Sequence, residues 1–67
     1  MVSLLVNGEK KRFDREPTVT ELLRELKVAS AAVAVEVNRE IVPRRAHPER
    51  LLKDGDSVEV VTFVGGG

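Results

Sequence analysis

The sequence predicts a small α+β fold in which one mixed β-sheet packs against one helix. Three features indicate this: β-rich runs near both ends of the chain, an Asn-Gly pair directly after the first run, and one amphipathic helical segment between the runs. With 67 residues the chain can form only one domain, because so small a fold buries about 60% of the surface that its unfolded chain exposes. An apolar fraction of 42% and a charged fraction of 33% are typical of a folded domain.

The N-terminal segment has the pattern of a β-hairpin. Residues 2–6 are β-rich, and Asn7-Gly8 behind them is the pair that type I′ turns prefer, because both residues accept positive φ. The returning strand is expected over residues 9–13, with Phe13 as its inward anchor.

The next segment predicts the helix. Thr18 and Glu21 have the spacing of a capping box, in which the threonine oxygen accepts from the amide three residues on and the glutamate reaches back. The helix is expected over residues 19–27, with an apolar face formed by Val19, Leu22, Leu23 and Leu26.

Three further strands follow the helix. Residues 32–37 alternate as a half-buried strand does, and residues 41–43 form a short strand whose proline confines it to an edge or a strand end. Residues 57–64 are the best strand of the sequence, rich in valine. The segment before it has no clean period, although Leu51 and Leu52 are expected to fill part of the core.

Strand, strand, helix, strand, short strand, strand is the order of the β-grasp, or ubiquitin-like, fold, in which the last strand lies parallel to the first at the centre of the sheet. Residues 1–64 would form this domain and residues 65–67 a flexible glycine tail. The expected core consists of Leu4, Val6, Val19, Leu22, Leu23, Leu26, Val33, Val35, Val37, Ile41, Leu51, Val58 and Val60.

Composition and charge exclude several classes of function. A formal net charge of +0 leaves no concentrated basic face for nucleic acid or an anionic membrane. The absence of cysteine excludes disulfides, thiolate metal ligands and thiol nucleophiles. No apolar run approaches the roughly 20 residues that cross a bilayer, and the start is too short and lacks the basic leader of a signal peptide. We therefore expect a cytoplasmic protein that is monomeric when free.

The polar residues of the body have structural interpretations. The basic runs at residues 10–12 and 44–45 are expected to be solvated faces, because no aromatic residues alternate with them as in a nucleic-acid site. His47 is interpreted as a surface loop residue rather than a metal ligand, since no second ligand stands at metal spacing. Asp54 and Asp56 flank a glycine and are expected to form a turn by bonding their own backbone.

The chain ends in Gly65, Gly66 and Gly67. Glycines have no packing value and lose more entropy on ordering than any other residue, so the fold does not need them. A tail without Cβ atoms is thin and flexible enough to thread a narrow channel and to deliver its terminal carboxylate to another protein's active site. A carboxylate is a poor electrophile and must first be activated, and attack on the α-phosphate of ATP would give an acyl-adenylate.

The activating chemistry should belong to another protein. Nothing in the sequence resembles a glycine-rich phosphate loop with its lysine, so ATP and magnesium would be bound by a partner enzyme and not by this chain. The chain would then be a macromolecular substrate with no catalytic residue of its own.

Several motifs together resemble those of one known family. They are Val6-Asn7-Gly8, Thr18-Val19-Thr20-Glu21-Leu22-Leu23, Ala34-Val35-Glu36-Val37-Asn38, Ile41-Val42-Pro43-Arg44, Asp54-Gly55-Asp56 and Phe63-Val64-Gly65-Gly66-Gly67. Over nearly its whole length the sequence resembles the ThiS family, the sulfur carriers of thiamin thiazole biosynthesis.

The resemblance implies a reaction sequence and its partners. An E1-like enzyme would adenylate the terminal glycine, here Gly67, and sulfur from a cysteine desulfurase or another donor would convert it to a thiocarboxylate. Thiazole synthase would then consume that sulfur. Gly67 would be the loaded residue, and Gly65 and Gly66 would thread the partner's channel.

An apolar strip is expected on the sheet face away from the helix. Val61 and Phe63 share one face of the last strand, and Leu5 on the first strand should point the same way. Exposed apolar surface of this kind usually marks an interface, so these three residues are predicted to form a docking patch for the partner enzymes. The competing interpretation is that Phe63 merely folds over the sheet edge.

The tail alone leaves other functions open. Carriers for molybdopterin synthesis and tRNA thiolation share this fold and ending, as do ubiquitin-like covalent protein modifiers. The asparagine of Val37-Asn38 and the motif at residues 41–44 resemble the thiazole branch. A β-grasp interaction module with an incidental glycine end is the third possibility, and it would tolerate loss of the tail.

Overall fold

A computed structural model describes residues 1–63 of the chain, and Val64 and the three predicted tail glycines lie outside the described residues. The elements in chain order are β1 Val2–Val6, β2 Glu9–Phe13, α1 Val19–Leu26, the 3₁₀ turn η1 Ser30–Ala32, β3 Val33–Val37, β4 Glu40–Val42, the 3₁₀ turn η2 Arg44–Ala46 and β5 Ser57–Thr62.

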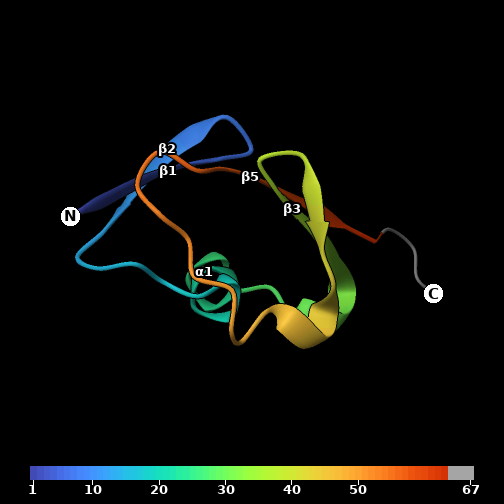
Figure 1. Cartoon of the computed structure of the whole chain (residues 1–67). Coiled ribbons are helices and arrows are strands. Elements are labelled where there is room, and N and C mark those ends of the chain that lie inside the picture. The colour runs from blue at the N-terminus through green and yellow to red at the C-terminus, as the bar shows by residue number, and fades with distance from the viewer. Residues whose placement is uncertain (64–67) are drawn as a thin grey trace.

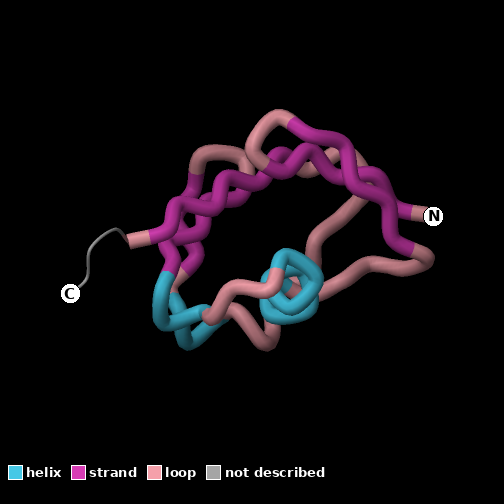
Figure 2. Tube along the Cα trace, turned by 180° about the vertical axis from the view of Figure 1, so that it is seen from behind, coloured by secondary structure: helices cyan, strands magenta, loops and turns pink. Residues whose placement is uncertain are grey.

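The five strands form one mixed sheet in the order β2-β1-β5-β3-β4. β5 lies parallel to β1 and antiparallel to β3, and the two hairpins complete the sheet on either side. The sheet curves over α1, which occupies its concave side (Figures 1 and 2). This confirms the predicted α+β β-grasp fold, including the parallel central pair.

Both hairpin turns have the backbone conformation that their residues favour. Asn7 and Gly8 have φ values of 51° and 83°, and Asn38 and Arg39 have φ values of 50° and 71°. Two successive residues with positive φ are the mark of a type I′ turn, whose twist matches that of the flanking strands. The predicted N-terminal hairpin is thus confirmed.

The helix begins and ends through local hydrogen bonds. The Glu21 N–H donates to Thr18 Oγ1 at 3.1 Å, and the Thr18 N–H donates to Glu21 Oε1 at 2.9 Å, which is the predicted capping box. At the other end Lys27 is left-handed, with φ 62°, and its N–H donates to the Arg24 carbonyl. The Val28 N–H donates to the Leu23 carbonyl, which completes a Schellman motif. Among residues 1–63 no helix is long and apolar enough to cross a membrane.

The core lies between the sheet and α1, and three predicted core residues are placed differently. Ile41 is 75% exposed, Leu51 is 45% exposed, and Leu26 is only half-buried. Ile41 pairs with Glu36 and therefore points outward, since its neighbour Val42 pairs with the buried Val35. The buried hydrophobic residues are Val2, Leu4, Val6, Val19, Leu22, Leu23, Val33, Val35, Val37, Val42, Leu52, Val58 and Val60.

His47 is not the surface loop residue that the sequence suggested. Its side chain is 1% exposed, with Nδ1 3.1 Å from Ser30 Oγ and Nε2 3.1 Å from the Val42 carbonyl oxygen. A carbonyl can only accept, so Nε2 carries the proton and donates it; in the neutral ring Nδ1 then accepts from the Ser30 hydroxyl. The buried histidine ring therefore links η1 to the end of β4 through its two hydrogen bonds.

Candidate functional site

The candidate site begins where β5 leaves the sheet. β5 lies between β1 and β3 and runs toward the end of the sheet away from Met1 (Figure 1). It buries Val58 and Val60 against the core, and after its last residue the Phe63 N–H still donates to the Ala32 carbonyl at 3.0 Å. Predicted to extend to Val64, the strand ends at Thr62. Gly65, Gly66 and Gly67, the predicted tail, lie outside the described residues.

Asn7 holds the outer half of β5, a role that the sequence analysis did not assign to it. The Asn7 N–H donates to the Val58 carbonyl at 2.9 Å, and the side-chain amide then bonds both backbone groups of Val60. Nδ2 donates to the Val60 carbonyl at 3.1 Å, and Oδ1 accepts from the Val60 N–H at 2.8 Å. The side chain thus replaces the backbone ladder at the point where β1 turns away. The two residues are 53 positions apart in the sequence, so this contact could be predicted only from the register of β1 and β5.

The other end of β5 is fixed by the predicted aspartate turn. Asp54 Oδ1 accepts from the Ser3 N–H at 2.7 Å, and Asp56 Oδ2 accepts from the Lys53 N–H at 2.9 Å. Asp56 Oδ1 also accepts from Asn38 Nδ2 at 2.9 Å. Asp56 therefore bonds the backbone of its own turn, as expected, whereas the Asp54 carboxylate bonds β1, 51 positions away, instead of its own turn.

The predicted docking residues share the sheet face away from α1, called here the open face. Leu5, Val61 and Phe63 are 46%, 59% and 61% exposed. Val61 stands opposite Ala34 on β3, and with Phe63 these residues form a tail-end patch, defined as Ala34, Val61 and Phe63. Leu5 stands opposite Ser57, four positions before Val61, which is about 13 Å along a strand. The three predicted residues therefore do not form one continuous strip.

Ile41, predicted to be a core residue, instead adds exposed apolar surface to the open face. It pairs with Glu36, which in turn pairs with Glu59 on β5. Residues directly opposite on neighbouring strands project from the same face, so all three side chains lie on the open face. Ile41 thus stands one strand beyond the tail-end patch.

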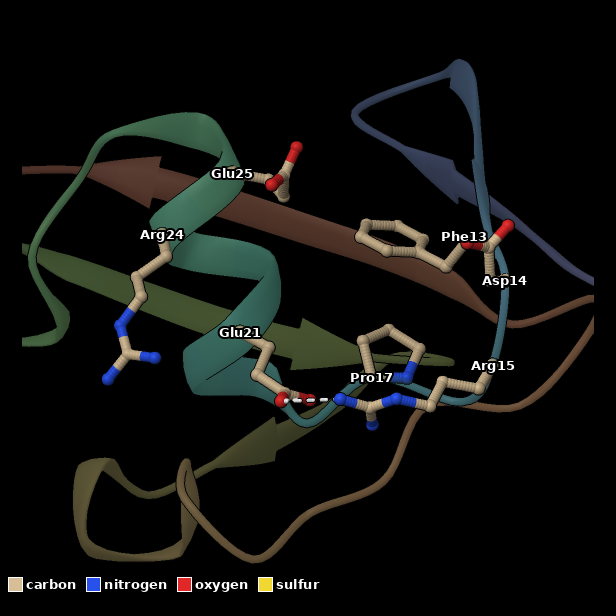
Figure 3. Close-up of a pocket in the computed structure, with 7 residues that line it drawn as sticks. All are labelled: Phe13, Asp14, Arg15, Pro17, Glu21, Arg24 and Glu25. Atoms are coloured by element: carbon tan, nitrogen blue, oxygen red, sulfur yellow. Dashed lines mark hydrogen bonds and ion pairs between the residues drawn. The ribbon is translucent and has the colours of Figure 1, made fainter.

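A separate hollow of about 330 Å³ lies between the end of β2 and α1 (Figure 3). The rings of Phe13 and Pro17 face it, and Arg15 Nη2 lies 3.4 Å from Glu21 Oε2 at its edge. The Thr18 N–H that donates to Glu21 lowers the pKa of this carboxyl below its usual value, and Arg15 lowers it further. The residues that line this hollow do not belong to the tail-end patch. Among residues 1–63 no cluster of side chains could hold a metal ion.

Together, a five-stranded mixed sheet around one helix and a last strand at the centre of the sheet define a ubiquitin-like β-grasp protein. Comparison with known proteins specifies the class further. The ThiS family matches residues 4–67, and the chain belongs to this family.

Full-length relatives support the assignment. The chain is 40% identical over 62 residues to the sulfur carrier protein ThiS of Thermus thermophilus, covering 92% of this chain and 95% of the relative. It is 35% identical over 65 residues to that of Bacillus subtilis, covering 96% and 98%. A crystal structure of a thiamine biosynthesis protein (ThiS) from Geobacter metallireducens superposes with a TM-score of 0.82 at 45% identity, covering 98% of this chain and 100% of that chain.

The chain also matches part of a longer protein. It is 47% identical over 66 residues to a thiazole synthase of Paramagnetospirillum magneticum, covering 98% of this chain but only 20% of the relative's length. A domain of this kind therefore also occurs within chains that carry the name of a thiazole synthase.

Proposed function

We propose that this ThiS-family sulfur carrier carries sulfur as a thiocarboxylate on Gly67 and delivers it for the synthesis of the thiamin thiazole. The observation that most directly supports this proposal is the position of β5, a central strand that is hydrogen-bonded on both sides. In the sequence this strand is followed by three glycines at residues 65–67, which the family match includes. A rigid body that presents a terminus free of side chains suits delivery into another protein's active site. As a carrier the chain is a substrate of enzymes rather than a catalyst.

Loading requires two steps. The Gly67 carboxylate attacks the α-phosphate of ATP in the site of an E1-like enzyme, which forms the acyl-adenylate and releases pyrophosphate. A sulfur nucleophile derived from a cysteine desulfurase or another donor then displaces AMP from the acyl carbon. Sulfide gives the thiocarboxylate directly, whereas an enzyme persulfide gives an acyl disulfide, whose S–S bond a thiol must reduce, forming a new disulfide and releasing the thiocarboxylate. ATP and magnesium belong to the enzyme, while Gly65 and Gly66 occupy the channel that leads to its reaction centre.

The receiving enzyme is a thiazole synthase. Support comes from the relatives of that name, in which a region similar to this chain forms about one fifth of the protein. A carrier domain and the enzyme that it supplies meet more often when they are parts of one chain, because linkage raises their effective concentration. Cytoplasmic residence is part of the proposal, since the first loading step consumes ATP.

The tail-end patch, at the end of β5, is the main docking surface for the enzymes. Val61 and Phe63 are exposed beside the point where the chain leaves the sheet, so an enzyme that holds the tail must also cover them. Leu5 lies on the same face but farther away, and its contribution should be smaller.

The proposal is tested by intact mass. The chain is incubated with ATP, magnesium, the adenylating enzyme and a sulfur source, and the expected result is the mass increase of one oxygen-for-sulfur exchange, located at Gly67 by fragmentation. A chain that remains unmodified while the enzyme loads a known carrier would refute the proposal. Ladders of the chain on lysines of other proteins would favour the covalent-modifier alternative instead.

A further inference from the structure

Two glutamates stand directly opposite each other near the middle of the open face. Glu36 and Glu59 are register partners in the β3–β5 pairing, and both alternate with buried valines, so both side chains point away from α1. Cβ atoms of such partners are about 4.5 to 5.5 Å apart. Among residues 1–63 neither carboxylate takes part in an ion pair, and Arg39, which lines a hollow of about 410 Å³ together with Glu59, does not form one with it.

This arrangement is unfavourable for the isolated fold. Like charges directly opposite in a sheet destabilise the pairing, and glutamate has a low preference for strands. Apolar surface borders the pair: Ile41 stands opposite Glu36 on one side, and the Val61–Ala34 pair follows next along β5 and β3. A cation on a docked partner, surrounded by apolar contacts, would turn this repulsion into attraction.

The length of the tail limits how far from the end of β5 the active site of an enzyme that acts on Gly67 can lie. Four residues follow Phe63, and four extended residues span at most about 14 Å. When the Gly67 carboxylate reaches the α-phosphate of ATP, the end of β5 is therefore close to the nucleotide site. Sites that bind a triphosphate commonly use arginine or lysine side chains, which give their surroundings a positive potential.

On the basis of the function proposed above, we propose that Glu36 and Glu59 form an acidic recognition point for a basic side chain, arginine or lysine, at the mouth of the adenylating enzyme's nucleotide site. The tail-end patch and Ile41 supply the apolar contacts around this charge pairing. The carboxylates thus contribute to partner recognition, while Gly67 is the residue that the enzyme adenylates.

The test is steady-state adenylation, measured as pyrophosphate release with the enzyme that loads the wild-type chain. The paired substitution Glu36→Gln with Glu59→Gln keeps the side-chain size and removes both charges. It should lower kcat/KM at least about tenfold, mainly through KM, and weaken its dependence on salt. Replacing both residues with lysine should lower it further.

A matched control changes net charge equally at a distance from the open face. Glu25 on α1 and Glu49 after η2 are exposed, and Glu25→Gln with Glu49→Gln should leave kcat/KM and its salt dependence at the wild-type values. Thermal melting of all variants separates recognition from folding. The glutamine pair on the open face should melt at or above the wild-type temperature, since it removes a repulsion.

The outcomes separate this inference from the proposed function. If the wild-type chain is loaded and the open-face glutamine pair is loaded equally well at every salt concentration, the acidic recognition point is refuted while the carrier function stands. An effect confined to sulfur delivery to thiazole synthase, with adenylation unchanged, would also overturn it. If the wild-type chain is never loaded, the proposed function itself fails.

Discussion

His47 connects three segments that are far apart along the chain. Its ring bonds Ser30 in η1 and the Val42 carbonyl at the end of β4, and its own carbonyl accepts from the Thr20 N–H in α1 at 3.1 Å. A buried polar ring costs free energy unless its nitrogens are paired, and here both are. The histidine therefore helps to fix the otherwise irregular segment between β4 and β5.

Replacing His47 tests this role. His47→Leu replaces the ring with an apolar group of similar bulk and removes the hydrogen bonds of the ring to the Ser30 hydroxyl and the Val42 carbonyl, so stability should fall by about 2 to 4 kcal/mol. Urea unfolding measures the loss. The exposed neighbour provides the control, because Glu49→Ala should change stability by less than about 0.5 kcal/mol. An equal effect of the two changes would contradict a structural role for the ring.

Phe63 is the last described residue before the glycines and the largest side chain of the tail-end patch. Because it is 61% exposed, Phe63→Asp should leave the fold intact yet slow adenylation of Gly67 by about tenfold or more. Leu5→Asp introduces the same charge on the same face but farther from the tail, and its effect should be smaller. Circular dichroism and adenylation kinetics check the prediction, and unchanged kinetics for Phe63→Asp would refute the docking role.

β5 combines two kinds of support along its length. On the β3 side it pairs through the backbone from Val58 to Thr62, whereas on the β1 side the Asn7 side chain takes over at Val60. The strand that leads to the tail is therefore anchored at its outer half as well as its inner half. In the proposed function, such a fixed strand end would lower the entropic cost of binding to an enzyme that acts on Gly67.

Asn7→Gly removes the side-chain amide while preserving a residue that accepts the positive φ of the turn. We expect a loss of stability of about 1 to 2 kcal/mol and faster hydrogen exchange at the Val60 amide. Asn7→Asp retains an acceptor for the Val60 N–H but cannot donate to its carbonyl, so it should fall between the glycine variant and the wild type. Exchange at Val60 that is unaffected by Asn7→Gly would contradict the anchoring role.

The capping box of α1 makes helix stability depend on pH. Hydrogen bonding from the Thr18 N–H lowers the pKa of Glu21 below its ordinary value of 4.5. Its contribution to stability is present above that value and is lost as the pH falls through the lowered pKa, because the unfolded state then binds the proton more tightly. Glu21→Gln keeps a capping partner without this titration, so its unfolding free energy should depend less on pH in this range. Identical pH profiles for the two proteins would contradict the assignment.

The molecule as a whole shows which features a sequence can predict. Each main element has a local signal: Asn7-Gly8 for the first hairpin, Thr18 and Glu21 for the helix start, and valine alternation for β3 and β5. The order of these elements was sufficient to predict the β-grasp arrangement. The family that the sequence resembles is also the one whose model matches residues 4–67.

The incorrect predictions concern features that only tertiary contacts determine. β4 has three residues, too few to show an alternation, and its pairing with β3 buries Val42 and exposes Ile41. His47 lies in a segment without a period, so nothing local indicated its burial. The distance between Leu5 and Val61 depends on the parallel register of β1 and β5, which the sequence does not specify.

The central claim is that Gly67 is the sulfur-carrying end of a rigid body. The most direct test loads the chain with isotopically labelled sulfur, removes the sulfur donor, and supplies the loaded chain to thiazole synthase with its remaining substrates. The account predicts that the label appears in the thiazole in proportion to the thiocarboxylate consumed, and that a chain lacking residues 65–67 melts like the wild type but transfers none. Labelled thiazole formed equally well by the chain lacking residues 65–67 would contradict the central claim.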